Sequence, residues 1–217
     1  MIKIQWLGHA AFLVTNGEKR IIIDPYESGS YSEAVNYKPI RLEADFVVTT
    51  TPGRPDHAFT QDIKGNPKVI SEAGKHRING LKIYGEADFS DRSGDQERGR
   101  VTVFVIDFEN IRICHLGNLG HLLTEEKVKR IGRVDVLMVP VGGFFTLGVP
   151  EVEQVIEALK PKLIFPMHFQ NEACLFQIDK VDRFLEGKQN VRTLNTSEMT
   201  IENLPETSEI VVLKHAF

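Results

Sequence analysis

The sequence predicts an α/β (α+β) protein in which two β-sheets pack together and helices lie outside them. Two observations support this class. A unit made of a hairpin and two further strands occurs twice along the chain, and amphipathic helices alternate with the strands of the second half. Such helices need the face of a sheet to cover their apolar side. Because the two copies follow each other without a linker, we expect residues 1–217 to form a single domain.

The repeated unit consists of three features that recur in the same order. Its first copy has a hairpin of residues 11–14 and 20–23, with Asn16-Gly17 in the connection, and this dipeptide is a strong hairpin signal. Its second copy has a hairpin of residues 101–107 and 111–114. The strands that follow are residues 44–48 and 66–70 in the first copy, and residues 134–138 and 160–164 in the second. We therefore predict an internally duplicated fold.

Helices are expected mainly in the second half. Thr124 can cap the first of them, because two glutamates follow it in the first turn. Pro150 can open the second, which Pro161 then stops. The third is expected over residues 178–185, with Gly187 as its terminator. Two sheets with these helices outside are the most economical arrangement.

The composition excludes several classes of protein. The chain has 217 residues, 26 Lys+Arg against 30 Asp+Glu, and a net charge of -4. A chain of this length can bury a stable core without disulfides, and Cys114 and Cys174 follow no metal-ligand spacing, as expected for thiols in a reducing compartment. The acidic balance and the lack of a basic stripe argue against nucleic-acid binding. No apolar run approaches a membrane span, so we expect a cytoplasmic protein without a membrane partner.

Polar residues follow three of the predicted strands. Asp56 and His57 come after the strand at residues 44–48, Asn118 comes after residues 111–114, and His168 comes after residues 160–164. Strand exits at the same edge of a sheet are where sites are built. Two imidazoles and a carboxylate can hold zinc, or iron or manganese in a facial triad. The alternative is an Asp-His turn and an isolated histidine, and on spacing alone both remain open.

Several segments together resemble the metallo-β-lactamase superfamily, and within it the small stand-alone metal-dependent hydrolases similar to L-ascorbate-6-phosphate lactonase. These segments are Trp6–Phe12, Ile22–Pro25, Asp56-His57, His115–Asn118, Val139–Gly143 and Pro166–His168. The resemblance spans essentially the whole chain in the correct order. It implies a four-layer αββα sandwich, which agrees with the duplicated unit.

The ligand motifs of that family are only partly present. Active members read Thr-His-x-His-x-Asp-His where this chain has Pro52 and Arg54 in place of the first two histidines. Ser90 or a neighbour stands where the family has a third histidine, and Asn118 replaces the bridging aspartate. By this resemblance the first metal site is lost. The second metal site is retained in Asp56, His57 and His168.

We therefore expect a degenerate dinuclear centre that holds no metal or one divalent metal, with zinc preferred over manganese or iron. Proline cannot coordinate a metal, and a permanent guanidinium cation repels one. The protein would be inactive or weakly active as a hydrolase. In any residual reaction Asp56 would serve as ligand and base, and Asn118 would donate a hydrogen bond to substrate.

Two other functions remain open on the sequence. One is an active hydrolase of a cyclic ester or phosphoester. The other is a non-catalytic protein that binds a small anionic ligand through Arg54, whose cation would fill the vacated metal position unless it pairs with Asp56 or turns to solvent. His9 is the second candidate ligand-binding residue; the family position that it resembles lies near the pocket but is not a metal ligand, and simple packing is its alternative. A homo-oligomer is also left open.

Overall fold

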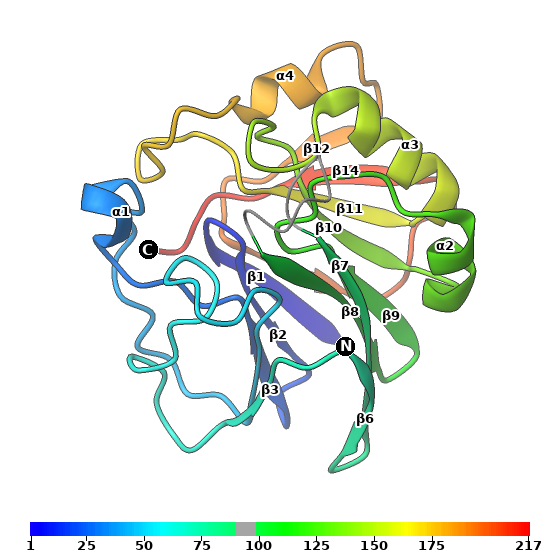
Figure 1. Cartoon of the computed structure of the whole chain (residues 1–217). Coiled ribbons are helices and arrows are strands. Elements are labelled where there is room, and N and C mark those ends of the chain that lie inside the picture. Colours follow the sequence, from blue (N-terminus) through cyan, green and yellow to red (C-terminus); the bar gives the residue numbers. More distant parts are fainter. Residues whose placement is uncertain (90–98) are drawn as a thin grey trace.

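The computed structural model describes residues 1–89 and 99–217, so the expectation for Ser90 lies outside the described residues (Figure 1). Its strands form two sheets that face each other. The first sheet, in spatial order, contains β13 (Glu198–Ile201), β1 (Ile2–Gly8), β2 (Ala11–Thr15), β3 (Arg20–Ile23), β4 (Phe46–Val48) and β5 (Lys68–Ile70). The second contains β12 (Val191–Thr193), β14 (Glu209–Val212), β11 (Leu163–Met167), β10 (Val136–Pro140), β9 (Ile111–His115), β8 (Arg100–Phe108), β7 (Leu81–Phe89) and β6 (Gly74–Ile78).

The topology confirms the internal duplication. In the first sheet β2 pairs antiparallel with β3, which continues into the parallel pairs β3–β4 and β4–β5. In the second sheet β8, β9, β10 and β11 repeat the same pattern. Even one side-chain contact recurs: Asp45 accepts the backbone N–H of Arg20 at 2.7 Å, and Asp135 accepts that of Arg112 at 2.8 Å. Each aspartate thus fixes the start of one parallel pair.

The main core lies between the two sheets. Side chains alternate along each strand, so every second residue of β2 and β8 faces the opposite sheet. Phe12, Phe104 and Phe165 are buried there with aliphatic residues of both sheets. A second, smaller core lies on the outer face of the first sheet, where Leu13 and Val47 are buried.

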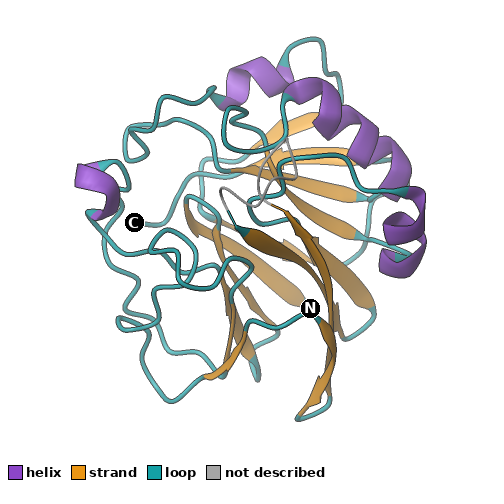
Figure 2. Cartoon of the chain, in the orientation of Figure 1, coloured by secondary structure: helices purple, strands orange, loops and turns teal. Residues whose placement is uncertain are grey.

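Three helices cover the second sheet, as Figure 2 shows: α2 (Glu125–Ile131), α3 (Val149–Leu159) and α4 (Val181–Leu185). The caps of the first two are as predicted. Thr124 accepts the N–H of Lys127, and Pro150 lies in the first turn of α3, which ends at a left-handed Lys160. The third helix is shorter than predicted. Its expected first turn is diverted because the Asp179 N–H donates to Gly142 and the Asp179 carbonyl accepts from Gln170.

The outer face of the first sheet differs from the predicted fourth layer. Of the described segments, only the short turn α1 (Ser30–Glu33) is helical there, and the rest of the cover is loop (Figure 2). Tyr26 secures this loop, since its buried hydroxyl lies 3.1 Å from the carbonyl oxygen of Leu7 and 3.0 Å from that of Lys38. Such contacts satisfy a polar group that a loop would otherwise leave unpaired. Within the described ranges, none of the helices has the length and apolar character needed to span a membrane.

The packing predicts a large difference between two phenylalanines. Phe104 is completely buried between the sheets, whereas Phe144 is 68% exposed. Phe104→Ala should lower the free energy of unfolding by about 3–5 kcal/mol, because it removes transfer energy and leaves a cavity. Phe144→Ala should cost less than about 1 kcal/mol. Urea unfolding of both variants checks this, and equal losses would contradict the placement of the core.

Candidate metal centre

Four donor side chains meet where strands of both sheets end. His9 follows β1, Asp56 and His57 lie in the loop after β4, and His168 directly follows β11. One ligand atom of each residue lies within 4.8 Å of every other. All four residues are at most 2% exposed. The described part of the chain therefore contains a compact donor cluster of three imidazoles and one carboxylate.

The distances and the unpaired atoms suit a single small cation. Asp56 Oδ2 lies 3.6 Å from His9 Nε2 and 3.5 Å from His57 Nε2. Ligands of a tetrahedral zinc at about 2.0–2.1 Å are separated by roughly 3.3 Å, close to these values. His9 Nε2, His57 Nε2 and His168 Nδ1 are buried and have no hydrogen-bond partner within the described residues. Buried polar atoms without partners are costly, so a bound metal would explain them.

The backbone brings two of the histidines together. The N–H of His168 donates to the carbonyl oxygen of His9 at 3.1 Å, and the two rings lie 4.2 Å apart between centroids. Both residues have left-handed backbones, with φ of 49° at His9 and 53° at His168. This conformation is unfavourable for residues other than glycine and concentrates at functional sites.

Asp24 orients His57 from behind the cluster. Its Oδ2 lies 2.8 Å from Nδ1 of His57, and its Oδ1 accepts the N–H of Thr50 at 2.6 Å. Asp24 is fully buried and also left-handed, with φ of 47°. A carboxylate on Nδ1 holds the proton there and leaves Nε2 free to coordinate, as is usual for metal-binding histidines.

The electrostatics of the cluster favour coordination by His9, Asp56 and His168. Burial lowers the pKa of His9 and, together with the neighbouring His9 and His57, holds the pKa of His168 well below its usual value. Both rings are therefore neutral at pH 7, the state that binds metal. Burial opposes the charge of Asp56, but His57, His9 and Arg54 outweigh it and hold its pKa far below the usual range. For His57, burial is outweighed by Asp56 and Asp24, which raise its pKa.

The outer oxygen of Asp56 is covered by two further side chains. Tyr31 donates its hydroxyl to Asp56 Oδ1 at 2.9 Å, and Arg54 Nε lies 3.4 Å from the same atom. The guanidinium of Arg54 also lies 5.7 Å from the centre of the Tyr31 ring. Phe176 completes this cover with its ring 5.8 Å from that of His9. Asp56 therefore presents Oδ2 to the histidines of the cluster, while Tyr31 and Arg54 hold Oδ1.

The sequence-predicted residues are thus largely brought together. Asp56, His57 and His168 lie in one cluster, and Arg54 pairs with Asp56 as one of its alternatives expected. His9 belongs to the same cluster, a role that the family resemblance does not give it. Asn118 is buried, and its side-chain oxygen has no hydrogen-bond partner among the described residues.

Asp24 and Tyr31 were not among the predicted site residues. Asp24 accepts the backbone N–H of Thr50 and also holds His57. Its position at a strand exit beside Pro25 is the one signal in the sequence that pointed toward the site. Tyr31 offered no such signal, because a turn of left-handed residues places it over Asp56.

Comparisons with known proteins agree with this architecture. Residues 3–168 match the beta-lactamase superfamily domain. A UPF0173 metal-dependent hydrolase of Thermococcus onnurineus is 31% identical over 194 residues, covering 78% of this chain and 85% of the relative. A UPF0173 metal-dependent hydrolase of Pelotomaculum thermopropionicum is 28% identical, covering 96% of this chain and 100% of the relative. A Thermotoga maritima structure, described as a candidate Zn-dependent hydrolase of the metallo-β-lactamase superfamily, is 33% identical with a TM-score of 0.83, covering 98% of both chains.

Two facing mixed sheets with candidate metal ligands at their shared strand ends, and the similarity to the Thermotoga maritima structure, define a protein of metallo-β-lactamase fold. The chain belongs to the beta-lactamase superfamily, in the family of UPF0173 metal-dependent hydrolases.

The contact between Asp24 and His57 predicts an effect on metal affinity. Asp24→Asn should weaken zinc binding about 10–100-fold, because the amide no longer fixes the tautomer of His57 as an anion does. Competition with a chromophoric chelator measures the affinity. The matched control is Asp135→Asn, since Asp135 is a buried aspartate that instead accepts the backbone N–H of Arg112 and a hydrogen bond from the Arg133 guanidinium. Equal zinc affinities in the two variants would refute the orienting role.

Proposed function

We propose that this chain is a mononuclear member of its hydrolase family, which binds one divalent metal through His9, Asp56, His57 and His168. The observation that carries the proposal is the group of four buried donors, three of whose nitrogens have no other partner in the described chain. Three imidazoles and a carboxylate suit zinc first, and iron or manganese less well.

We further propose that the protein is weakly active or inactive as a hydrolase. Four protein donors complete a tetrahedral shell, whereas catalytic zinc sites keep one position open. Pro52 and Arg54 stand where active members of the family that this chain resembles carry two histidines of the first metal site. The Arg54 guanidinium beside Asp56 adds a positive charge that disfavours a second cation.

The residues around the cluster have separate tasks in this proposal. A divalent metal held by the four donor residues would polarise an ester or phosphoester oxygen as a Lewis acid only where one coordination position opened. Asp24 fixes the ring of His57, and Tyr31 fixes the carboxylate of Asp56. Phe176 and Tyr31, whose rings lie 5.5 Å apart, help to exclude water from the donors. Asn118 keeps an amide that can donate a hydrogen bond to a substrate.

The metal stoichiometry tests the mononuclear assignment. Protein loaded with excess zinc and then desalted should retain about one equivalent, measured by inductively coupled plasma mass spectrometry. His168→Ala should lose most of it, because three donors bind more weakly than four. His76→Ala is the matched control, since His76 lies on β6 and bonds to the Glu72 carbonyl instead. Two equivalents in the wild type, or none, would contradict the proposal.

A variant that opens the shell tests the proposed low activity. His9→Ala removes one donor and leaves Asp56, His57 and His168, so a coordination position becomes free. Zinc-loaded His9→Ala should hydrolyse an activated phosphodiester or lactone faster than the wild type, although its zinc affinity should be lower. Initial rates at saturating zinc measure this. Rapid turnover by the wild type that is lost in His9→Ala would show that the wild-type centre is an active catalyst.

A further inference from the structure

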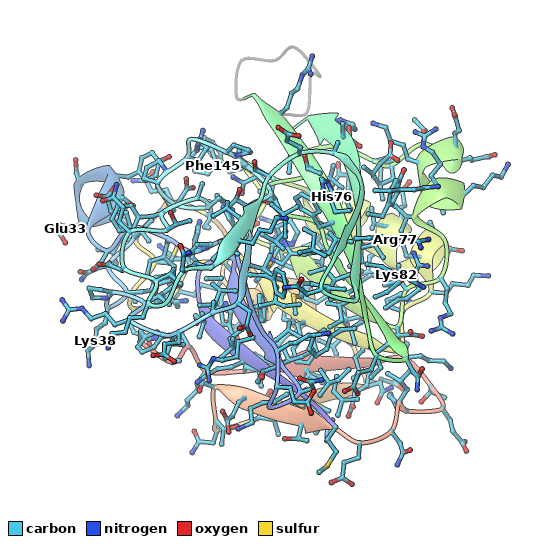
Figure 3. The ribbon with its side chains drawn as sticks, turned by 90° about the horizontal axis from the view of Figure 1, so that it is seen from below. Glu33, Lys38, His76, Arg77, Lys82 and Phe145 are labelled. Carbon is cyan, nitrogen blue, oxygen red and sulfur yellow. The ribbon has the colours of Figure 1, made fainter. Side chains whose placement is uncertain are left out.

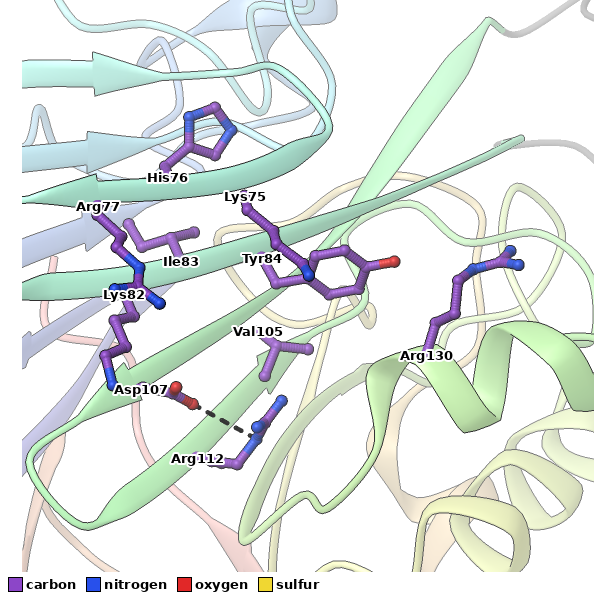
Figure 4. Close-up of a pocket in the computed structure, with 10 residues that line it drawn as sticks. All are labelled: Lys75, His76, Arg77, Lys82, Ile83, Tyr84, Val105, Asp107, Arg112 and Arg130. Atoms are coloured by element: carbon purple, nitrogen blue, oxygen red, sulfur yellow. Dashed lines mark ion pairs between the residues drawn. The ribbon is translucent and has the colours of Figure 1, made fainter.

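The second sheet carries a basic groove on the face that lies against α2. Figure 4 shows its lining, which comes from β6, β7, β8 and β9 together with the end of α2. The groove encloses about 480 Å³. The side chains that matter here, called the basic groove below, are Lys75, Arg77, Lys82, Tyr84, Arg112 and Arg130.

Strand register explains why these side chains share one face. Arg77 of β6 lies opposite Lys82 of β7, Lys82 lies opposite Asp107 of β8, and Asp107 lies opposite Arg112 of β9. One row of charged residues therefore crosses four neighbouring strands. Two residues further along, Lys75 lies opposite Tyr84, in the same orientation because side chains alternate along a strand.

The positive charge of this groove is only partly compensated. Arg112 lies 3.4 Å from Asp107, and Arg130 lies 2.7 Å from Glu86. Lys75, Arg77 and Lys82 form no ion pair with an acidic side chain of the described chain. Arg77 and Lys82 are directly opposed like charges, an arrangement that destabilises a sheet unless an anion lies between them.

Protection of the sheet edge does not account for the whole groove. β6 is an edge strand, and cations on an edge strand discourage pairing with other chains. Edge protection therefore explains the cations Lys75 and Arg77, which lie on β6. It leaves Lys82 unexplained, because this residue lies on an interior strand of the same sheet. Arg112 also lies on an interior strand, but Asp107 and the carbonyl oxygen of Ile131 hold its guanidinium.

The floor of the groove is suited to an organic group. Tyr84 is half-buried, and Figure 4 shows its ring lying between Lys75 and Arg130. Its hydroxyl donates to Glu86, which holds the ring in place. Val105, opposite Tyr84 on the neighbouring strand, adds an apolar surface. An aromatic ring among cations can pack against an uncharged group while the cations bind its charges.

We propose that the basic groove binds a small molecule with two or more linked phosphate groups. Arg77 and Lys82 hold the phosphates, Lys75 and Arg112 flank them, and Tyr84 packs against the organic part of the ligand. Guanidinium groups match the geometry of phosphate oxygens. The groove has the size of a small-molecule site, and the net charge of -4 disfavours a long polyanion that would extend beyond it.

The groove is distinct from the metal centre. Its lining includes none of the four donor residues His9, Asp56, His57 and His168. Figure 3, seen from below, shows Arg77 and Lys82 on one side of the molecule and Glu33 and Lys38 on the other. A ligand could therefore occupy the groove whether or not metal is bound.

Calorimetric titration with pyrophosphate and tripolyphosphate tests the proposal. The full chain, first freed of metal with a chelator, should bind one equivalent, more tightly than it binds inorganic phosphate and less tightly as salt rises. The double variant Arg77→Gln/Lys82→Gln should weaken binding about tenfold or more, because two charge-assisted contacts are lost. Lys38→Gln is the matched control, as it removes an exposed cation outside the groove and should leave the affinity unchanged.

Two further variants show whether pyrophosphate binds in the basic groove or at the metal centre. His168→Ala should bind pyrophosphate like the wild type, and Arg77→Lys should retain part of the affinity and confirm that the groove is folded. Equal binding by the wild type and the double variant would overturn the proposal, as would binding that only His168→Ala abolishes. The proposal would be overturned in favour of nucleic acid if a single-stranded oligonucleotide of twenty nucleotides bound more tightly than pyrophosphate and lost this binding in the double variant. Aggregation of the double variant without any wild-type binding would favour edge protection.

Discussion

The candidate site depends on one backbone hydrogen bond, from the N–H of His168 to the carbonyl oxygen of His9. It joins the exit of β11 in the second sheet to the exit of β1 in the first, so the carboxyl ends of both sheets meet at one point. Gly142 lies against the other side of His168, where its N–H donates to the His168 carbonyl oxygen and a Cβ atom would lie 2.3 Å from that oxygen. Both His9 and His168 have left-handed backbones at this junction.

Once these ends are joined, the chemistry of the centre follows from charge and burial. A single carboxylate, Asp56, is surrounded by His9, His57 and Arg54 and remains ionised although it is buried. Two of the imidazoles are neutral, and Asp24 holds the third in a coordinating orientation. The result is a donor set matched to one cation. The basic groove on the outer face of the second sheet instead favours an anion, since its cations face solvent in a row.

Much of the fold could be predicted because its signals are local. The hairpin turn at Asn16-Gly17, the cap at Thr124 and the apolar strands of both copies each occur within a few residues. The loop layer over the first sheet could not be predicted, since it is held by distant contacts such as those of the Tyr26 hydroxyl. The late start of the predicted third helix has a similar cause, because Asp179 bonds to Gly142 and Gln170 instead of starting a turn.

The sequence by itself determined the duplicated α/β architecture, because its signals lie within short runs of consecutive residues. Together with the family resemblance it also singled out Asp56, His57 and His168, which the structure places in one cluster. Only the tertiary structure decided that His9 joins them as a fourth candidate donor, that Asp24 orients His57, and that cations from three strands and α2 line one groove. The physical reason is distance along the chain. These contacts join residues whose proximity depends on how the sheets pack and on strand register, which no local pattern specifies.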